Sequence, residues 1–164
     1  MKKIVFFVFI LFAVLPCFSQ GLDTRPMSWQ MDVRANVTAI ELPPLDLEGV
    51  VQQDSINDLD KSLPWRYGIS RPVRLDMMKD GEWTDLPNVG RIWRVAIKSA
   101  DAINLSVNFD DFYIPQGARL QLYNEDRTDL SKTYSSAQNR QNKRVASWYV
   151  TGDLIYIEYF VPDY

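Results

Sequence analysis

The feature that most restricts the fold is a regular alternation of apolar and polar residues that begins after Leu63. In residues 93–98, Trp, Val and Ile occupy every second position, and charged or small residues lie between them. The same pattern recurs in residues 103–109, 119–122 and 155–159. A period of two places successive side chains on opposite faces of a strand, so each run has one face for a core. The pattern predicts an all-β fold of antiparallel strands.

Turn-forming residues separate these runs at intervals of roughly ten residues. The first group, Lys79-Asp80-Gly81, is expected to form a hairpin turn before the next strand. Short strands spaced in this way favour a jelly-roll-like β-sandwich over residues 63–164, rather than an α/β fold. Further turns are expected at residues 115–117, 124–127 and 151–153.

Residues 20–62 form a weakly patterned N-terminal extension. A short strand is expected at residues 37–40, before the break at Pro43-Pro44. A short helix is expected at residues 45–57, with Asp46 as its N-cap. Because Gly49 and several acidic residues make this helix weak in isolation, we expect it to pack on the β-domain that follows.

Residues 1–19 have the pattern of a signal peptide, with two lysines, an apolar run and small residues before Gln20. The apolar run is too short to span a bilayer, and no second hydrophobic stretch follows it. A lipid anchor on Cys17 is disfavoured by the proline before it. The sequence therefore predicts a protein that is secreted, periplasmic or on the cell surface, with no membrane association after cleavage.

The chain contains no histidine, and its single cysteine, Cys17, lies within the predicted signal peptide. A Ser-His-Asp triad, a Cys-His pair, a Cys/His zinc site and a disulfide are therefore excluded after cleavage. We expect no catalytic residue, no cofactor and no metal. Residues 20–164 carry 16 basic and 21 acidic residues, a net charge of −5 that disfavours nucleic acid as a partner.

Carboxylates are the remaining groups for acid–base chemistry. They are paired in sequence at Asp110-Asp111 and Glu125-Asp126, and Asp76 lies near Asp80. Either a glycosidase pair or a calcium site could use such groups. All of them fall in or beside expected turns, where Asp is favoured by the local backbone geometry. An enzyme built on carboxylates alone is therefore the least favoured class.

The chain has many aromatic residues, and some of them could form flat platforms for a sugar. Trp93 lies on the apolar face of its run and is expected in the core. Trp83, Tyr123 and Trp148 are the candidate surface contacts. A freestanding module that binds polysaccharide or the cell surface through these residues is one alternative for the function.

A second interpretation comes from the order of several short motifs. The motifs are Arg66-Tyr67-Gly68, Gly81-Glu82-Trp83, 90–95, 97–99, 104–109, 114–120, Tyr123-Asn124, Gly152-Asp153, 157–159 and Pro162. The series resembles the N-terminal region that precedes the protease domain in bacterial secreted, lysyl-endopeptidase-like serine proteases of the trypsin fold. The match also includes Leu42-Pro43 and residues 45–54, and so covers nearly all of the chain after the signal peptide.

The resemblance implies a non-catalytic β-domain whose partner is a trypsin-fold protease domain, joined in cis in a longer form of the chain. Such a domain would assist folding of the protease or shield its cleft until cleavage. It would need an apolar patch with a polar rim, exposed in the isolated domain. No position of this sequence matches a catalytic residue of the family, so none is assigned.

Overall fold

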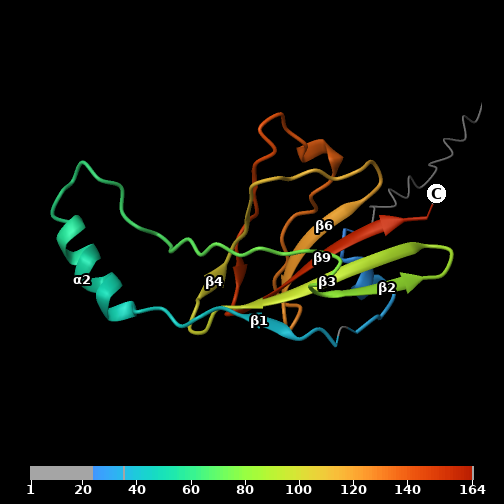
Figure 1. Cartoon of the computed structure of the whole chain (residues 1–164), viewed down its shortest axis with the longest axis horizontal. Coiled ribbons are helices and arrows are strands. Elements are labelled where there is room, and N and C mark those ends of the chain that lie inside the picture. Colours follow the sequence, from blue (N-terminus) through green and yellow to red (C-terminus); the bar gives the residue numbers. More distant parts are fainter. Residues whose placement is uncertain (1–23, 35, 164) are drawn as a thin grey trace, which may run out of the picture.

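The computed structural model of the chain describes residues 24–34 and 36–163, and its centre is one mixed sheet (Figure 1). The two longest strands, β3 (Gly90–Lys98) and β9 (Leu154–Pro162), pair antiparallel along their whole length. β6 (Arg119–Asn124) pairs with the other edge of β9. Along the free side of β3, β2 (Glu82–Leu86) pairs antiparallel with one half, and β1 (Ala39–Glu41) pairs parallel with the other.

Two short antiparallel ladders lie beside this sheet. β4 (Asn104–Leu105) pairs with β8 (Val150–Thr151), and β5 (Asn108–Phe109) pairs with β7 (Val145–Ala146). The predicted single strand at residues 103–109 is thus two strands. The prediction of a mainly β fold is confirmed, but β1 makes the main sheet mixed rather than purely antiparallel.

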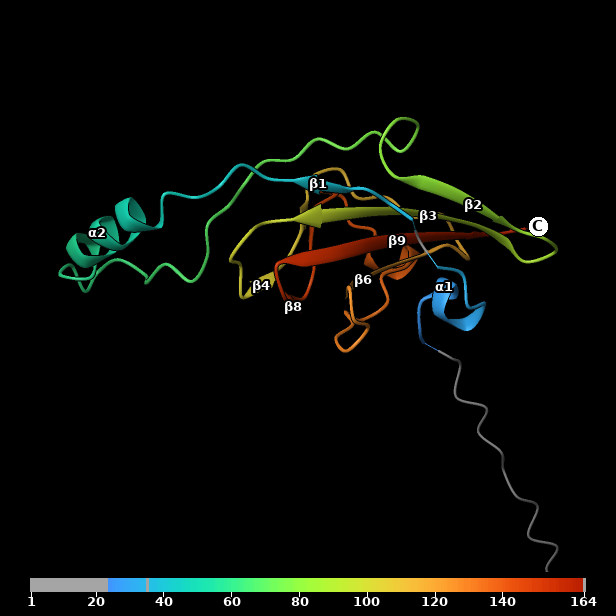
Figure 2. The ribbon, with the colours of Figure 1, turned by 90° about the horizontal axis from the view of Figure 1, so that it is seen from below.

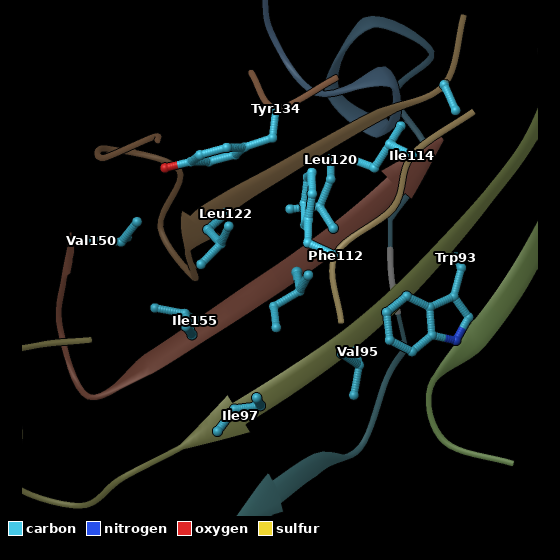
Figure 3. Packing of buried hydrophobic residues seen from close by; sticks show 12 residues of the cluster. Trp93, Val95, Ile97, Phe112, Ile114, Leu120, Leu122, Tyr134, Val150 and Ile155 are labelled. Atoms are coloured by element: carbon cyan, nitrogen blue, oxygen red, sulfur yellow. The ribbon is translucent and has the colours of Figure 1, made fainter. Parts of the chain in front are cut away.

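The main core lies on the face of the sheet that the alternation predicted. Trp93, Val95 and Ile97 of β3 point to the same side as Ile155 and Ile157 of β9, and Trp93 is buried as expected. Figure 3 shows Trp93, Val95, Ile97 and Ile155 gathered with the residues that cover them. The covering side chains come from the loops and short ladders, and they include Phe112, Ile114, Tyr134 and Val150.

The opposite face of the sheet is also covered, by an N-terminal segment that we define as residues 24–34. It contains the single-turn helix α1 (Met27–Gln30), and its Met27 and Val33 pack against a small core of Leu86, Ile92 and Phe160. The polar members of the alternation therefore do not all face solvent. Three of them, Arg94, Gln121 and Glu158, are buried.

The turns match the predicted positions with one exception. Ala118 donates to the carbonyl of Pro115 as expected, and Gly117 has a φ of +84°. Lys79-Asp80-Gly81 does form a turn, but no strand precedes it, so the predicted hairpin is wrong there. The hairpin of β2 and β3 turns instead at residues 87–89, where Asn88 has a φ of +61°. Asn tolerates this left-handed conformation better than most residues do.

The predicted helix is α2 (Leu47–Asn57), and its cap is also confirmed, because the carboxylate of Asp46 accepts a hydrogen bond from the amide of Gly49 at 3.0 Å. The expectation that this helix packs on the β-domain is wrong. None of its residues is buried, and Figures 1 and 2 show it held away from the sheet. A short capped helix can form here, but it covers no core.

Two further regions complete the description. A 3-10 helix, η1 (Ser136–Gln138), begins at Ser135 with a capping box. The predicted signal peptide at residues 1–19 lies outside the described residues. Within the described part, no helix has the length and apolar character needed to cross a membrane.

Candidate binding surfaces

The first candidate surface is an arm that we define as residues 44–70, comprising α2 and the chain that returns from it. Its base is fastened by Arg71, whose guanidinium donates to the carbonyl of Pro43 and to the hydroxyl of Ser99. Farther out, Arg66 pairs with Asp54 at 3.2 Å and donates to Gln53 at 2.9 Å. These contacts hold the returning chain against α2, so the two limbs form one structural unit.

Among the described residues, more than half of the exposed large hydrophobic side chains lie on the arm. Trp65 is 71% exposed and Tyr67 is fully exposed. Of the fifteen large hydrophobic side chains exposed in the described residues, eight belong to the arm. Exposed apolar side chains that gather on one segment are typical of an interaction site. Besides Trp65 and Tyr67, the exposed hydrophobic residues of the arm are Leu47, Val51, Ile56, Leu59, Leu63 and Ile69.

The arm is also acidic. It contains five acidic residues and two basic ones, Lys61 and Arg66, which give it a net charge of −3. Arg66 is engaged with α2, and the ammonium group of Lys61 lies 5.8 Å from the ring centre of Trp65. A surface that complements the arm would therefore be apolar with basic groups at its border.

The three aromatic residues predicted as surface contacts lie in different surroundings. Trp83 in β2 is half-buried against the main core, and its indole N–H donates to the carbonyl of Met77. The guanidinium of Arg91 covers its ring at 4.1 Å. Tyr123 in β6 is buried, with 4% of its surface exposed. Neither residue presents a ring face as an open platform.

Trp148 does present its ring to solvent. Its side chain is 63% exposed and stacks with Tyr149, with ring centres 5.2 Å apart and planes inclined by 25°. The backbone amide of Trp148 donates to the hydroxyl of the buried Tyr134 at 2.6 Å, which fixes the pair to the main core. Of the three predicted contacts, Trp148 alone keeps the geometry of a surface platform.

A second candidate site lies where the N-terminal segment meets the end of β6. Three rings form a ladder there: Trp29 meets Tyr123 edge to face at 5.1 Å, and Tyr123 stacks on Tyr156 at 5.4 Å. A depression of about 300 Å³ opens beside this ladder. Its lining residues are Arg34, Tyr123, Glu125, Arg127 and Tyr156.

The ladder rests on a buried polar group, the carboxylate of Glu158. It accepts hydrogen bonds from the hydroxyl of Tyr123 and from the backbone amide of Ser28, both at 3.0 Å. Burial raises the pKa of Tyr123 far above its ordinary value, and the negative charge of Glu158 raises it further. The Tyr123 hydroxyl therefore keeps its proton and donates a hydrogen bond to Glu158, and this hydrogen bond fixes the orientation of the Tyr123 ring.

Two more buried polar side chains bind the backbone of the N-terminal segment. The amide of Gln121 donates to the carbonyl of Thr24 at 2.6 Å. The guanidinium of Arg94 donates to the carbonyl of Val33 at 3.0 Å and to the hydroxyl of Thr84 at 3.1 Å. These contacts fix the wall of the depression that Arg34 contributes.

The predicted carboxylates occupy turns, as expected, and are used locally. Asp111 pairs with Lys143 at 2.9 Å. The carboxylate of Asp80 accepts from the backbone amide of Asp76 at 2.7 Å. Asp126 accepts from the hydroxyl of Thr128 at 2.8 Å.

The two other predicted carboxylates are Asp110, which lies 4.0 Å from Arg144, and Glu125, which lines the depression. The described residues contain no group of three or more His, Cys, Asp or Glu side chains arranged to hold a metal.

Sequence reasoning missed both the arm and the depression. The exposed Trp65 and Tyr67 could have been noticed, because they lie in a Pro- and Gly-containing stretch with no alternation. The depression left no such signal, since its residues come from three separate segments. No protein-family model matches the chain, and no match is found among solved structures.

Proposed function

We propose that this protein is an exported, non-catalytic module that binds the catalytic domain of a secreted trypsin-fold serine endopeptidase. The exposed apolar surface of the arm is the observation that carries this proposal. Eight large hydrophobic side chains exposed on the arm support it, because an accessory domain needs apolar side chains at its surface to bind its partner. The motif series that resembles the region before such protease domains includes Arg66-Tyr67-Gly68, which lies in the arm.

We also infer that the module is a β-sandwich. In this interpretation the main sheet is one layer, and the two short ladders with their loops are the other. The position of the main core supports it, because residues of β3, β6 and β9 meet residues of the covering loops there. The arm then leaves the sandwich between β1 and β2, where both limbs are fastened by Arg71.

The arm binds its partner through its aromatic and aliphatic side chains, and its acidic residues select a surface with basic groups. A stable interface of ordinary size buries about 800 Å² on each partner, which eight large hydrophobic side chains can largely supply. Because Arg66 and Arg71 already order the returning chain, less conformational entropy is lost on binding. Bound in this way, the module stabilises the folded catalytic domain or covers its cleft.

The test uses the catalytic domain of a bacterial secreted lysyl endopeptidase, diluted from urea with and without the full chain. We expect micromolar chain either to raise the yield of active enzyme or to inhibit enzyme that is already folded. The double variant W65A/Y67A should lose this effect, and the control Trp148→Ala should keep it. If the chain changes neither yield nor activity at micromolar concentration, the proposal is wrong.

The exposed pair of Trp148 and Tyr149 favours a second candidate function, a module that binds polysaccharide. Two adjacent rings fixed to the core form a ready surface for the apolar face of a sugar. A glycan array should then show binding that Trp148→Ala abolishes and W65A/Y67A leaves unchanged. An array without any bound glycan would remove this candidate.

A further inference from the structure

The depression beside the aromatic ladder has the chemistry of a small ligand site that is independent of the arm. Its walls come from the N-terminal segment, from β6 and β9, and from the turn after β6. A volume of about 300 Å³ is at the lower end for ligand pockets, so the ligand would be smaller than a typical drug.

Two guanidinium groups line this depression. Arg34 and Arg127 are both exposed, and neither forms an ion pair with another described residue. Arg127 is held by the turn, where its φ is +60°, and its guanidinium lies 5.7 Å from the ring centre of Trp29. With Glu125 as the one acidic residue of the lining, the site has a net positive charge. Guanidinium groups bind carboxylates with two parallel hydrogen bonds.

The depression also has an aromatic wall. Tyr156 is partly exposed and is backed by Tyr123, with ring planes only 16° apart. Burial and the nearby charge of Glu125 raise the pKa of Tyr156, so its hydroxyl keeps its proton and remains a donor. An apolar ring with a polar edge, next to two cations and one carboxylate, fits a ligand that combines an anionic group with a hydroxylated ring.

We propose that this depression binds a uronic acid, as a free monosaccharide or at the end of an acidic polysaccharide. The sugar carboxylate is bound by Arg34 and Arg127, the sugar ring lies against Tyr156, and Glu125 accepts hydrogen bonds from sugar hydroxyls. The proposal does not depend on the protease partner, because the arm contributes no residue to the site.

The test is an NMR titration of the full chain with glucuronate, glucose, acetate and inorganic phosphate, each added alone. Glucuronate should bind with a dissociation constant on the order of 1 mM, as expected for so small a ligand. It should shift the amide signals of residues 125–127 and 156. Each of the other three compounds should bind at least tenfold more weakly.

Matched variants assign the effect to the site. Arg127→Gln should weaken glucuronate binding at least tenfold, and Arg140→Gln, which removes the same charge from an exposed loop elsewhere, should change it less than twofold. Arg34→Gln gives the same test at the second arginine if the first variant does not fold. The proposal is wrong if acetate or phosphate binds as well as glucuronate, if the shifts lie elsewhere, or if Arg127→Gln and Arg140→Gln behave alike.

Discussion

The carboxylate of Glu158 accepts a hydrogen bond from the backbone amide of Ser28, 3.0 Å away and 130 residues earlier in the chain. Its other oxygen accepts from the hydroxyl of Tyr123. Because Glu158 and Ser28 are both buried, this carboxylate joins the N-terminal segment to two strands of the sheet at once. Together with Gln121 and Arg94, Glu158 therefore holds the N-terminal segment on the second face of the sheet.

We expect Glu158→Ala to lower the free energy of unfolding by roughly 3 kcal/mol, because it leaves a buried amide and a buried hydroxyl without an acceptor. Glu158→Gln should cost less, since it keeps the volume and one acceptor. The measurement is urea unfolding at neutral pH, with the exposed Glu82→Gln as a control expected within about 0.5 kcal/mol of wild type. A Glu158→Ala protein as stable as that control would contradict the account.

The raised pKa of Tyr123 predicts alkaline destabilisation. The unfolded chain releases this proton near pH 10, its ordinary value, whereas the folded chain retains it. Above pH 10 the unfolded state therefore binds fewer protons, and stability falls by up to about 1.4 kcal/mol per pH unit from this group. Unfolding measured between pH 8 and 11 should show a shallower decline in Tyr123→Phe than in wild type. Equal slopes would show that Tyr123 titrates normally.

Alanine substitutions at two glycines distinguish the cost of backbone strain from the cost of steric overlap. Gly90 and Gly152 both have positive φ, at +142° and +112°. A Cβ at Gly90 would overlap the carbonyl oxygen of Val161, whereas a Cβ at Gly152 meets nothing within 4 Å. We expect Gly90→Ala to destabilise the protein by at least about 2 kcal/mol more than Gly152→Ala, which carries the strain alone. Equal losses in thermal or urea unfolding would refute the β3–β9 register at this end.

A pair of tryptophan substitutions tests the division between the core and the arm. Trp93→Ala removes a buried ring and should cost about 3–5 kcal/mol. Trp65→Ala removes an exposed ring and should stay within about 0.5 kcal/mol of wild type. Urea unfolding of the two variants decides the matter. A large loss from Trp65→Ala would mean that the arm folds back on the sheet in solution.

Local patterns in the sequence were enough to predict several features. Alternation around Trp93 and Ile157 identified the strands and the face that forms the core. Asp46 identified the start of α2, because an N-cap acts within one turn of the helix. The turn at Gly117 followed from its composition. Each of these depends on neighbours in sequence.

Features that depend on distant segments could not be predicted. Alternation does not reveal what covers the polar face of a sheet, so the burial of Arg94 and Glu158 was missed. Their cover is a short segment with a single helical turn that has no side-chain cap. The parallel pairing of β1 was missed for the same reason, since three residues carry little pattern. Trp83, Tyr123 and Trp148 differ in tertiary surroundings alone, so composition could not separate them.

The central claim is that the arm is exposed in the isolated chain and binds a protein partner. Amide hydrogen exchange of the full chain tests this claim most directly. Alone, residues 47–67 should exchange much faster than β3 and β9, because local opening of the arm exposes no core. Addition of the catalytic domain of a secreted lysyl endopeptidase should slow exchange in the arm and leave the central strands unchanged. An arm already protected in the isolated chain, or unaffected by the added domain, would contradict the account.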